Sequence, residues 1–393
     1  MRKSYNQIIA ENLGIRLQQV ENTVKLLSDG ATVPFISRYR KELTGSLDEV
    51  QIGSVKEQLA KLQEIDARRE TILKSVEEQG KLTDELKGKI EAAETLTELE
   101  DIYLPYKQKR KTRASMARER GLEPLAQLLF KQQEKDVEER AESYVTDEVP
   151  SVDDALQGAR DIIAEWVNED TKARNLVRRH FTREAVVASH LVKGKEEEGI
   201  KYKDYFDFSE PLKKCPSHRL MAMLRGEEEG FLRISVDPDE EMTLDDLNNQ
   251  FVRGRNEAAS QVETAVRDSF KRLLSPSIET EFRAMAKAKA DDEAIRVFAD
   301  NLRQLLLASP LGQKRVLAID PGFRTGCKVV CLDEQGNLLH NEAIYPHEPQ
   351  KQVKQAATKI LSLVESYKIE AISIGNGTAS RETEAFIKKV PFT

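Results

Sequence analysis

The residues best placed to do chemistry are Asp320, Pro321 and Gly322, which follow a buried strand predicted over residues 315–319. An aspartate that ends a central strand and precedes a glycine serves one of two chemistries. It ligates Mg²⁺ together with further carboxylates, or its turn places backbone N–H groups and small hydroxyls around a phosphate. The alternative is a hairpin turn in which Asp and Gly serve only the backbone geometry.

The order of the neighbouring elements favours a turn that belongs to a known functional fold over a simple hairpin turn. Further strands are predicted over 326–332, 338–345 and 369–374, with a turn at 333–337 and an amphipathic helix that starts near Val353. Because a helix joins the last two strands, the fourth strand is predicted to run parallel to its neighbour. This order is the first half of an α/β ribonuclease-H-like domain, and we expect Thr393 to fall short of completing that fold.

Asn376, after the fourth strand, is expected to face Asp320. A nuclease of this fold places a carboxylate there, whereas an asparagine brings no negative charge and weakens Mg²⁺ binding. Glu382 and Glu384 on the next helix are candidates to substitute, although such helix-surface glutamates are usually solvated. We therefore expect Asp320 and Asn376 to be the vestige of a metal site. We expect the chain to have no catalytic residue and to bind no metal or cofactor. The rival hypothesis is a Mg²⁺-dependent nuclease that uses Asp320.

Two basic stretches are candidates for nucleic-acid contacts. The shorter one carries Arg38, Arg40 and Lys41 beside Tyr39. The longer one, residues 107–120, follows two tyrosines and contains Lys107, Lys109, Arg110, Lys111 and Arg113. Such cations contact phosphates, and nearby tyrosines stack on bases. The alternative is a solvated loop whose bases pair with the protein's own acids.

A mainly helical region must position these stretches. Residues 4–30 predict two short helices around Gly14, which suits a helix-turn-helix or, more often, any tight helical hairpin. Residues 32–45 predict a compact loop, and residues 48–79 a long helix. Further helices are predicted from Thr83, Thr97, Ser151, Thr171 and Thr243. The helical region that starts at Thr243 is predicted to break at 275–277. An irregular or extended segment is predicted at 202–208 and a short strand at 231–236.

The composition agrees with this layout and limits the function. The 393 residues suggest about two to four domains, which we divide at 1–106, 107–309 and 314–393. The net charge of −7 excludes a wholly basic surface, so nucleic acid must bind at local patches. Three cysteines without a C-x-x-C pair indicate neither a disulfide framework nor a zinc site. Without a signal core or membrane-length apolar run, we expect a reduced, cytoplasmic, soluble protein.

Five segments together resemble the bacterial Tex family of transcription accessory proteins. They are Ala31–Glu49 (ATVPFISRYRKELTGSLDE), Leu99–Lys107 (LEDIYLPYK), Ser217–Gly226 (SHRLMAMLRG), Leu317–Gly326 (LAIDPGFRTG) and Ile374–Thr383 (IGNGTASRET). The last two are similar to the family's YqgF-type, ribonuclease-H-like domain. The resemblance covers essentially the whole chain, with the segments in order.

The resemblance implies a cytoplasmic, non-catalytic protein that binds RNA or DNA in transcription and is related to a eukaryotic elongation factor. It also implies helix-hairpin-helix elements and a C-terminal OB-fold RNA-binding domain, so we expect this chain to be a truncated member. RNA polymerase or a ribonucleoprotein is an expected partner, and a membrane is not. A third hypothesis is a protein-binding scaffold built from the long helices.

Overall fold

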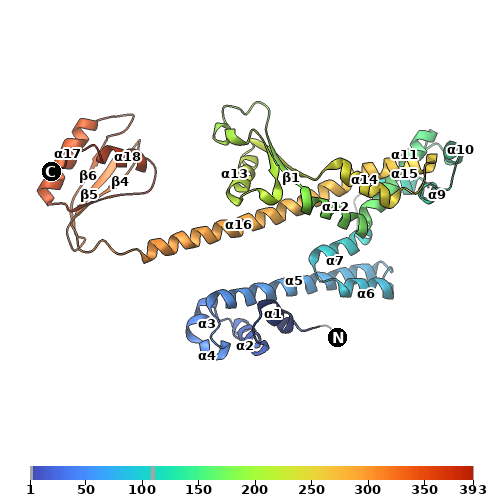
Figure 1. Ribbon diagram of the computed structural model, residues 1–393, viewed down its shortest axis with the longest axis horizontal. Coiled ribbons are helices and arrows are strands. Elements are labelled where there is room, and N and C mark those ends of the chain that lie inside the picture. Colours follow the sequence, from blue (N-terminus) through green and yellow to red (C-terminus); the bar gives the residue numbers. More distant parts are fainter. Residues whose placement is uncertain (1–2, 108–110, 393) are drawn as a thin grey trace. The chain divides into compact units, whose positions relative to one another are not determined.

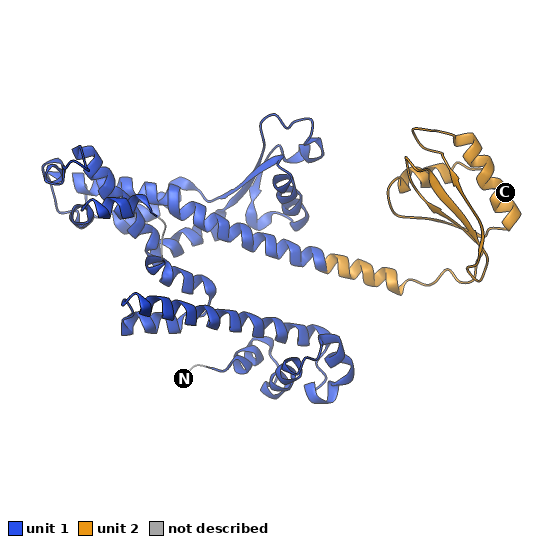
Figure 2. Cartoon of the chain, turned by 180° about the vertical axis from the view of Figure 1, so that it is seen from behind, with its two compact units in different colours: residues 1–295 blue, residues 296–393 orange. Residues whose placement is uncertain are grey.

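The computed structural model describes residues 3–107 and 111–392. The chain forms two compact units, residues 1–295 and 296–393 (Figure 2). The boundary falls inside helix α16 (Ser275–Leu307), which contributes to both units. None of the helices within the described ranges is both long and apolar enough to cross a membrane.

The first unit begins with a helical hairpin packed on a long helix (Figure 1). As predicted, α1 (Tyr5–Leu13) and α2 (Leu17–Ser28) meet at Gly14, whose backbone is left-handed. Both contact α5 (Glu49–Glu78), and their shared core includes the fully buried Ile9, Val20 and Val55. Helix α5 directly follows Asp48, whose carboxylate accepts a hydrogen bond from the Gln51 N–H and so caps the helix.

The prediction of a loop over 32–45 is wrong. The segment forms two helices, α3 (Val33–Tyr39) and α4 (Lys41–Thr44). Thr32 caps α3 by accepting a hydrogen bond from the Phe35 N–H. Pro34 lies in the first turn, where its missing N–H removes no helical hydrogen bond. Ile36 is fully buried against residues of α5, and this tertiary contact stabilises a helix too short to form alone.

Two further helices pack beside α5. They are α6 (Asp84–Ala92) and α7 (Leu96–Tyr103), followed by the 3-10 turn η1 (Leu104–Tyr106). Their core buries Ile72, Val76, Ile90 and Leu99. Helix α7 thus ends two residues before Pro105, which lies in η1.

A second helical group surrounds α11 (Val152–Glu169). A helix starts at the predicted position, and Ser151 caps it by accepting a hydrogen bond from the Asp154 N–H. Gly158 permits the close approach of Leu122, because a Cβ there would lie 2.3 Å from the Leu122 Cδ1. The group also contains α8 (Arg113–Glu119), α9 (Glu123–Lys131), α10 (Val137–Glu142), α12 (Thr171–Glu184), α14 (Glu240–Phe251) and α15 (Glu257–Ser269).

The first unit also holds an antiparallel sheet with strand order β2-β1-β3. Its strands are β1 (Val186–Leu191), β2 (Asp207–Pro211) and β3 (Leu232–Asp237), and α13 (Ser217–Glu228) packs against β3. The sequence indicated β3 and an extended segment that overlaps β2, but β1 was not predicted. The polar Ser189 interrupts the apolar pattern of β1. Its burial is possible because its hydroxyl donates a hydrogen bond to the Tyr205 carbonyl.

The predicted helix break at 275–277 is also wrong. Helix α15 continues through a π-helical turn, η4 (Phe270–Leu274), directly into α16. The Ser275 N–H donates to the Phe270 carbonyl, a bond that spans five residues. This wider turn accommodates Pro276, whose ring would clash with a carbonyl in a regular helix.

The second unit contains a mixed sheet with strand order β6-β5-β4-β7. Its elements are β4 (Val316–Asp320), β5 (Cys327–Leu332), β6 (Leu338–Ile344), α17 (Val353–Tyr367), β7 (Ala371–Ile374) and α18 (Ser380–Ile387). As predicted, β7 pairs parallel to β4 and the other pairs are antiparallel. Cys327 and Cys331 are fully buried in one core with both helices, and burial raises the pKa of the Cys331 thiol.

Candidate nucleic-acid interface

Aromatic rings and cations gather on the exposed side of α3 and α4. We call this surface the α3–α4 patch, and its members are Phe35, Arg38, Tyr39, Arg40 and Lys41. Phe35 and Tyr39 lie one helical turn apart, with ring centroids 5.4 Å apart. The Arg40 guanidinium carbon lies 4.9 Å from the Phe35 ring centroid. Since Tyr39 is 62% exposed and Phe35 40% exposed, both rings are open to a ligand.

Neighbouring helices hold the patch in a fixed position. Ile36 anchors α3 from the opposite side by its complete burial. From α2, Gln19 Nε2 donates to the Gly45 carbonyl at 3.0 Å, and Asn22 Nδ2 donates to the Leu43 carbonyl at 2.6 Å. These bonds satisfy carbonyls that the end of α4 leaves without helical partners. Little reorganisation is then needed when a ligand binds.

The cations of the patch remain available to a ligand. Within the described residues, no ion pair joins Arg38, Arg40 or Lys41 to a carboxylate. Arg40 Nη1 donates to its neighbour's carbonyl, that of Tyr39, at 2.8 Å. Available cations contact phosphates, while exposed rings and a guanidinium plane stack on unpaired bases. The arrangement therefore suits a flexible, single-stranded nucleic acid.

The longer basic stretch mixes exposed and paired cations. Lys107 and Arg113 are exposed. Lys111 pairs with Glu119 at 3.3 Å, a contact between exposed groups that salt screens readily. Two further residues of this prediction lie outside the described residues: Lys109 and Arg110. Phosphate contacts by this stretch stay a prediction.

Arg118, near the end of the same stretch, forms an ion pair with a buried acid of α11. Its Nη1 donates to Glu165 at 2.6 Å, and the Glu165 side chain is only 9% exposed. The Thr112 hydroxyl donates to the other oxygen of the same carboxylate at 3.3 Å. At this residue the alternative interpretation is realised, because the base pairs with the protein's own acid.

The tyrosines beside the two stretches also differ. Tyr103 and Tyr106 pack against the core of α5, α6 and α7, and the Tyr103 hydroxyl lies 2.9 Å from the Ser75 hydroxyl. They are therefore poorly placed to stack on bases. Phe35 was not predicted as a site residue, because its spacing of four residues from Tyr39 becomes informative only once the segment is known to be helical.

Asp320 and Asn376 lie at the same edge of the sheet, where β4 and β7 end. Asp320 ends β4, Asn376 follows β7, and the parallel pairing of these strands aligns their ends. The Gly375 N–H donates to the Ile319 carbonyl at 2.8 Å, and a Cβ on Gly375 would lie 3.7 Å from the Asp320 Oδ1. The aspartate thus faces a neutral loop.

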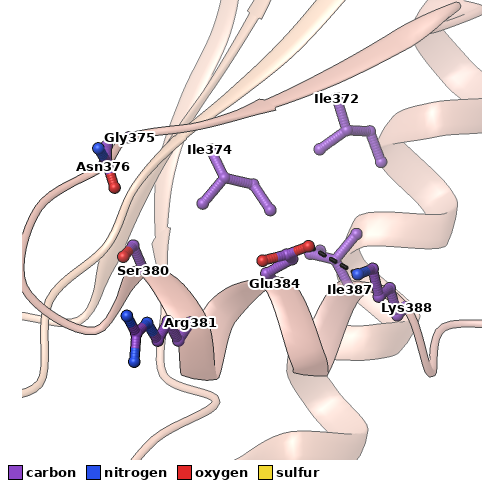
Figure 3. Close-up of a pocket in the computed structure, with 9 residues that line it drawn as sticks. All are labelled: Ile372, Ile374, Gly375, Asn376, Ser380, Arg381, Glu384, Ile387 and Lys388. Carbon is purple, nitrogen blue, oxygen red and sulfur yellow. Dashed lines mark hydrogen bonds and ion pairs between the residues drawn. The ribbon is translucent and has the colours of Figure 1, made fainter. Parts of the chain in front are cut away.

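Beside Asn376, residues of β7 and α18 line a hollow of about 610 Å³ (Figure 3). Glu384, one candidate substitute for the absent carboxylate, instead binds Lys388 on its own helix at 2.6 Å. The hydrogen bond from Lys388 lowers the pKa of this glutamate. Within the described ranges, no group of three or more His, Cys, Asp or Glu side chains is placed to hold a metal ion.

A buried charge network joins α7 to the central helices of the first unit. The Asp101 carboxylate accepts hydrogen bonds from Arg174 Nε at 2.6 Å and from Arg178 Nη2 at 2.9 Å. Arg178 Nε also donates to Glu281 at 3.0 Å. Burial alone would lower the pKa of Arg178, but the hydrogen bonds and charges of both acids raise it. The segment at 99–107 is therefore a structural junction.

These features define a multidomain, mainly helical protein with a YqgF-like sheet domain. Three family models match the chain in order, described as Tex-like protein N-terminal domain (residues 3–77), Tex central region-like (132–298) and Tex protein YqgF-like domain (314–391). The chain belongs to the Tex family.

Curated relatives support this assignment. The transcriptional accessory protein Tex of Neisseria gonorrhoeae is 41% identical over 384 residues, which cover 96% of this chain and 50% of that protein. The uncharacterized protein YdcI of Bacillus subtilis is 42% identical over 389 residues, covering 98% and 54%. The human S1 RNA-binding domain-containing protein 1 is 31% identical over 402 residues, covering 97% and 39%. The chain spans about half the length of these bacterial relatives.

Proposed function

We propose that this chain is a nucleic-acid-binding transcription accessory protein without catalytic activity. The observation that carries the proposal is the α3–α4 patch, where exposed rings lie beside cations that no described carboxylate pairs with. The names of two relatives agree, since one is a transcriptional accessory protein and another is named for an RNA-binding domain. Binding at a local patch is also compatible with the net charge of −7.

The patch supplies the main contacts in this proposal. Arg38, Arg40 and Lys41 contact phosphates, and Phe35 and Tyr39 stack on unpaired bases. The longer stretch adds phosphate contacts from Lys107, Lys109, Arg110, Lys111 and Arg113. Its contribution is smaller, because Lys111 already pairs with an acid.

The salt dependence of binding tests the phosphate contacts. Fluorescence anisotropy of a labelled single-stranded RNA is measured over a series of NaCl concentrations for the wild type and for Arg38→Gln/Arg40→Gln/Lys41→Gln. Each phosphate contact to a single strand contributes about −0.7 to the slope of log K against log salt. Loss of three contacts should therefore reduce the slope by about 2.

A matched variant shows whether the effect is local. Lys56, Lys74 and Lys87 are exposed lysines of the same unit without an ion pair among the described residues. Changing all three to Gln alters the total charge by the same amount, and we expect the wild-type slope. If the patch variant also kept the wild-type slope, the patch assignment would be wrong.

We further propose that the Asp320 turn is not catalytic. Asp320 faces the neutral Asn376 loop, and Glu384 is engaged by Lys388. Incubation with Mg²⁺ and branched or single-stranded DNA should give no cleavage. Cleavage that disappears in Asp320→Asn would instead establish the rival hypothesis of a nuclease.

The α1–α2 hairpin has the layout of a helix-turn-helix, and we propose that it supports the patch instead of reading a duplex. Gln19 and Asn22 of α2 hold the carbonyls at the end of α4. Glu21 adds a negative charge to the exposed side of α2. Equal affinity for a single strand and for a duplex of the same sequence would contradict this proposal.

A protein partner in the transcription machinery is a second proposal. It is favoured by an exposed apolar stripe on α16, formed by Ile295, Phe298, Leu302 and Leu305 at alternating three- and four-residue spacing. Capture of purified RNA polymerase that survives nuclease treatment would support it. Capture that nuclease abolishes would show that nucleic acid bridges the two proteins.

A further inference from the structure

An apolar hollow of about 310 Å³ lies in the first unit, away in sequence from the α3–α4 patch. The end of α12, the 3-10 turn η3 (Leu212–Lys214) and α16 line it. Its floor holds the rings of Phe181 and Phe282, with centroids 5.1 Å apart, and both residues are buried. Met285 belongs to the lining and is 58% exposed, so a flexible apolar side chain stands at the opening.

Backbone hydrogen bonds fix the walls of this hollow. The Leu212 N–H donates to the Ala185 carbonyl at 2.8 Å, and the Ala185 N–H donates to the Phe181 carbonyl at 3.2 Å. Lys213 Nζ donates at 2.7 Å to the Arg183 carbonyl, which lies in the last turn of α12. A cation there also favours the negative end of the helix dipole. The hollow is therefore formed before any ligand binds.

The charged side chains that line the hollow all have one sign. Arg183, Lys213 and Lys289 line it together with the apolar residues, and its lining contains no carboxylate. Within the described part of the chain, no ion pair engages these three side chains. Charge complementarity at an apolar site lined by cations without a carboxylate favours a negative ligand.

We propose that this hollow binds an acidic peptide segment of a partner protein. One large apolar side chain of the segment inserts against Phe181 and Phe282, while its carboxylates lie near Arg183, Lys213 and Lys289. A buried apolar floor favours a peptide anchor over a nucleic acid, which binds through exposed rings and phosphate contacts. A peptide that folds as an amphipathic helix, with apolar residues at helical spacing, fits this hollow.

The probe is a fluorescein-labelled synthetic peptide of about 15 residues, with Leu and Phe at helical spacing and Asp or Glu elsewhere. One matched peptide replaces Leu and Phe by Ser, and another replaces the acids by Gln. We expect saturable binding of the first peptide to the full chain by anisotropy. The two matched peptides should each bind at least about tenfold more weakly, because each lacks one part of the recognition.

The protein variants place the site. Met285→Glu puts a carboxylate at the opening and should weaken peptide binding about tenfold, and Lys289→Glu should weaken it about fivefold. Met242→Glu is the matched control, because Met242 on α14 is similarly exposed at 54% and lies outside the hollow. Since all three residues are exposed, the melting temperatures of the variants should match that of the wild type.

Wild-type affinity in Met285→Glu, or equal affinity for the serine peptide, would overturn the proposal. So would a single-stranded RNA that displaces the peptide and loses its own binding in Met285→Glu, because the hollow would then be a nucleic-acid site. The triple glutamine variant of the α3–α4 patch should bind the peptide like the wild type. The outcome for the hollow is thereby separate from the outcome for the patch.

Discussion

The two basic stretches look alike in the sequence and differ in the fold. Both place several cations beside tyrosines. In the α3–α4 patch the Tyr39 ring is exposed and the cations have no acidic partners among the described residues. Beside the longer stretch Tyr103 packs on a core, and within the stretch Arg118 pairs with the buried Glu165. A run of cations in a sequence therefore combines groups that stabilise the fold with groups that remain available to a ligand.

This difference predicts two classes of variant. Removing a paired charge should lower the free energy of unfolding, because the partner stays behind in a site with little water. Removing an unpaired cation should leave stability unchanged and weaken binding. The following variants test that separation.

The largest effect is expected for Asp101→Ala. This change leaves the guanidinium groups of Arg174 and Arg178 without their shared carboxylate, and Asp101 is only 4% exposed. The free energy of unfolding should fall by about 3–5 kcal/mol. Denaturant unfolding measures this loss. Asp292→Ala, at an exposed position of α16, is the control and should change stability by less than about 0.5 kcal/mol.

A smaller loss is expected for Arg118→Gln. Glu165 would lose the ion pair with Arg118 but keep the hydrogen bond from Thr112. Because Arg118 is 30% exposed, solvent screens part of the interaction, and the loss should be about 1–2 kcal/mol. Arg38→Gln in the patch should stay within about 0.5 kcal/mol of the wild type. Similar losses in both variants would contradict the division into paired and available cations.

The smallest effects concern single cations in RNA binding. Arg38→Gln should reduce the slope of log K against log salt by about 0.7. Lys111→Gln should change the slope by less than half of that amount, because Glu119 already balances its charge. Anisotropy titrations over a range of NaCl concentrations compare the two variants. A larger change for Lys111→Gln would move the main phosphate contacts to the longer stretch.

The sequence allowed the second unit to be predicted closely, because its strands alternate with clear turns. The parallel pairing of β7 with β4 followed from that pattern, and this pairing places Asp320 and Asn376 at the same edge of the sheet. Local signals failed where tertiary contacts decide. The burial of Ile36 makes residues 33–39 helical, and a π-helical turn carries α16 past Pro276.

The candidate site was predicted less completely. Its cations were identified, but their availability depends on partners that are distant in the sequence, such as Glu165 for Arg118. Phe35 was missed because its pairing with Tyr39 requires a helix. Charge and ring content can be counted in a sequence, whereas pairing and exposure are properties of the fold.

The central claim is that the α3–α4 patch binds unpaired bases by stacking, and Tyr39 tests it most directly. Base–aromatic stacking contributes about 1–3 kcal/mol per base, so Tyr39→Leu should weaken the binding of a single-stranded RNA by about 5- to 150-fold. Tyr39→Phe keeps the ring and should bind within about twofold of the wild type. Wild-type affinity in Tyr39→Leu would contradict the account.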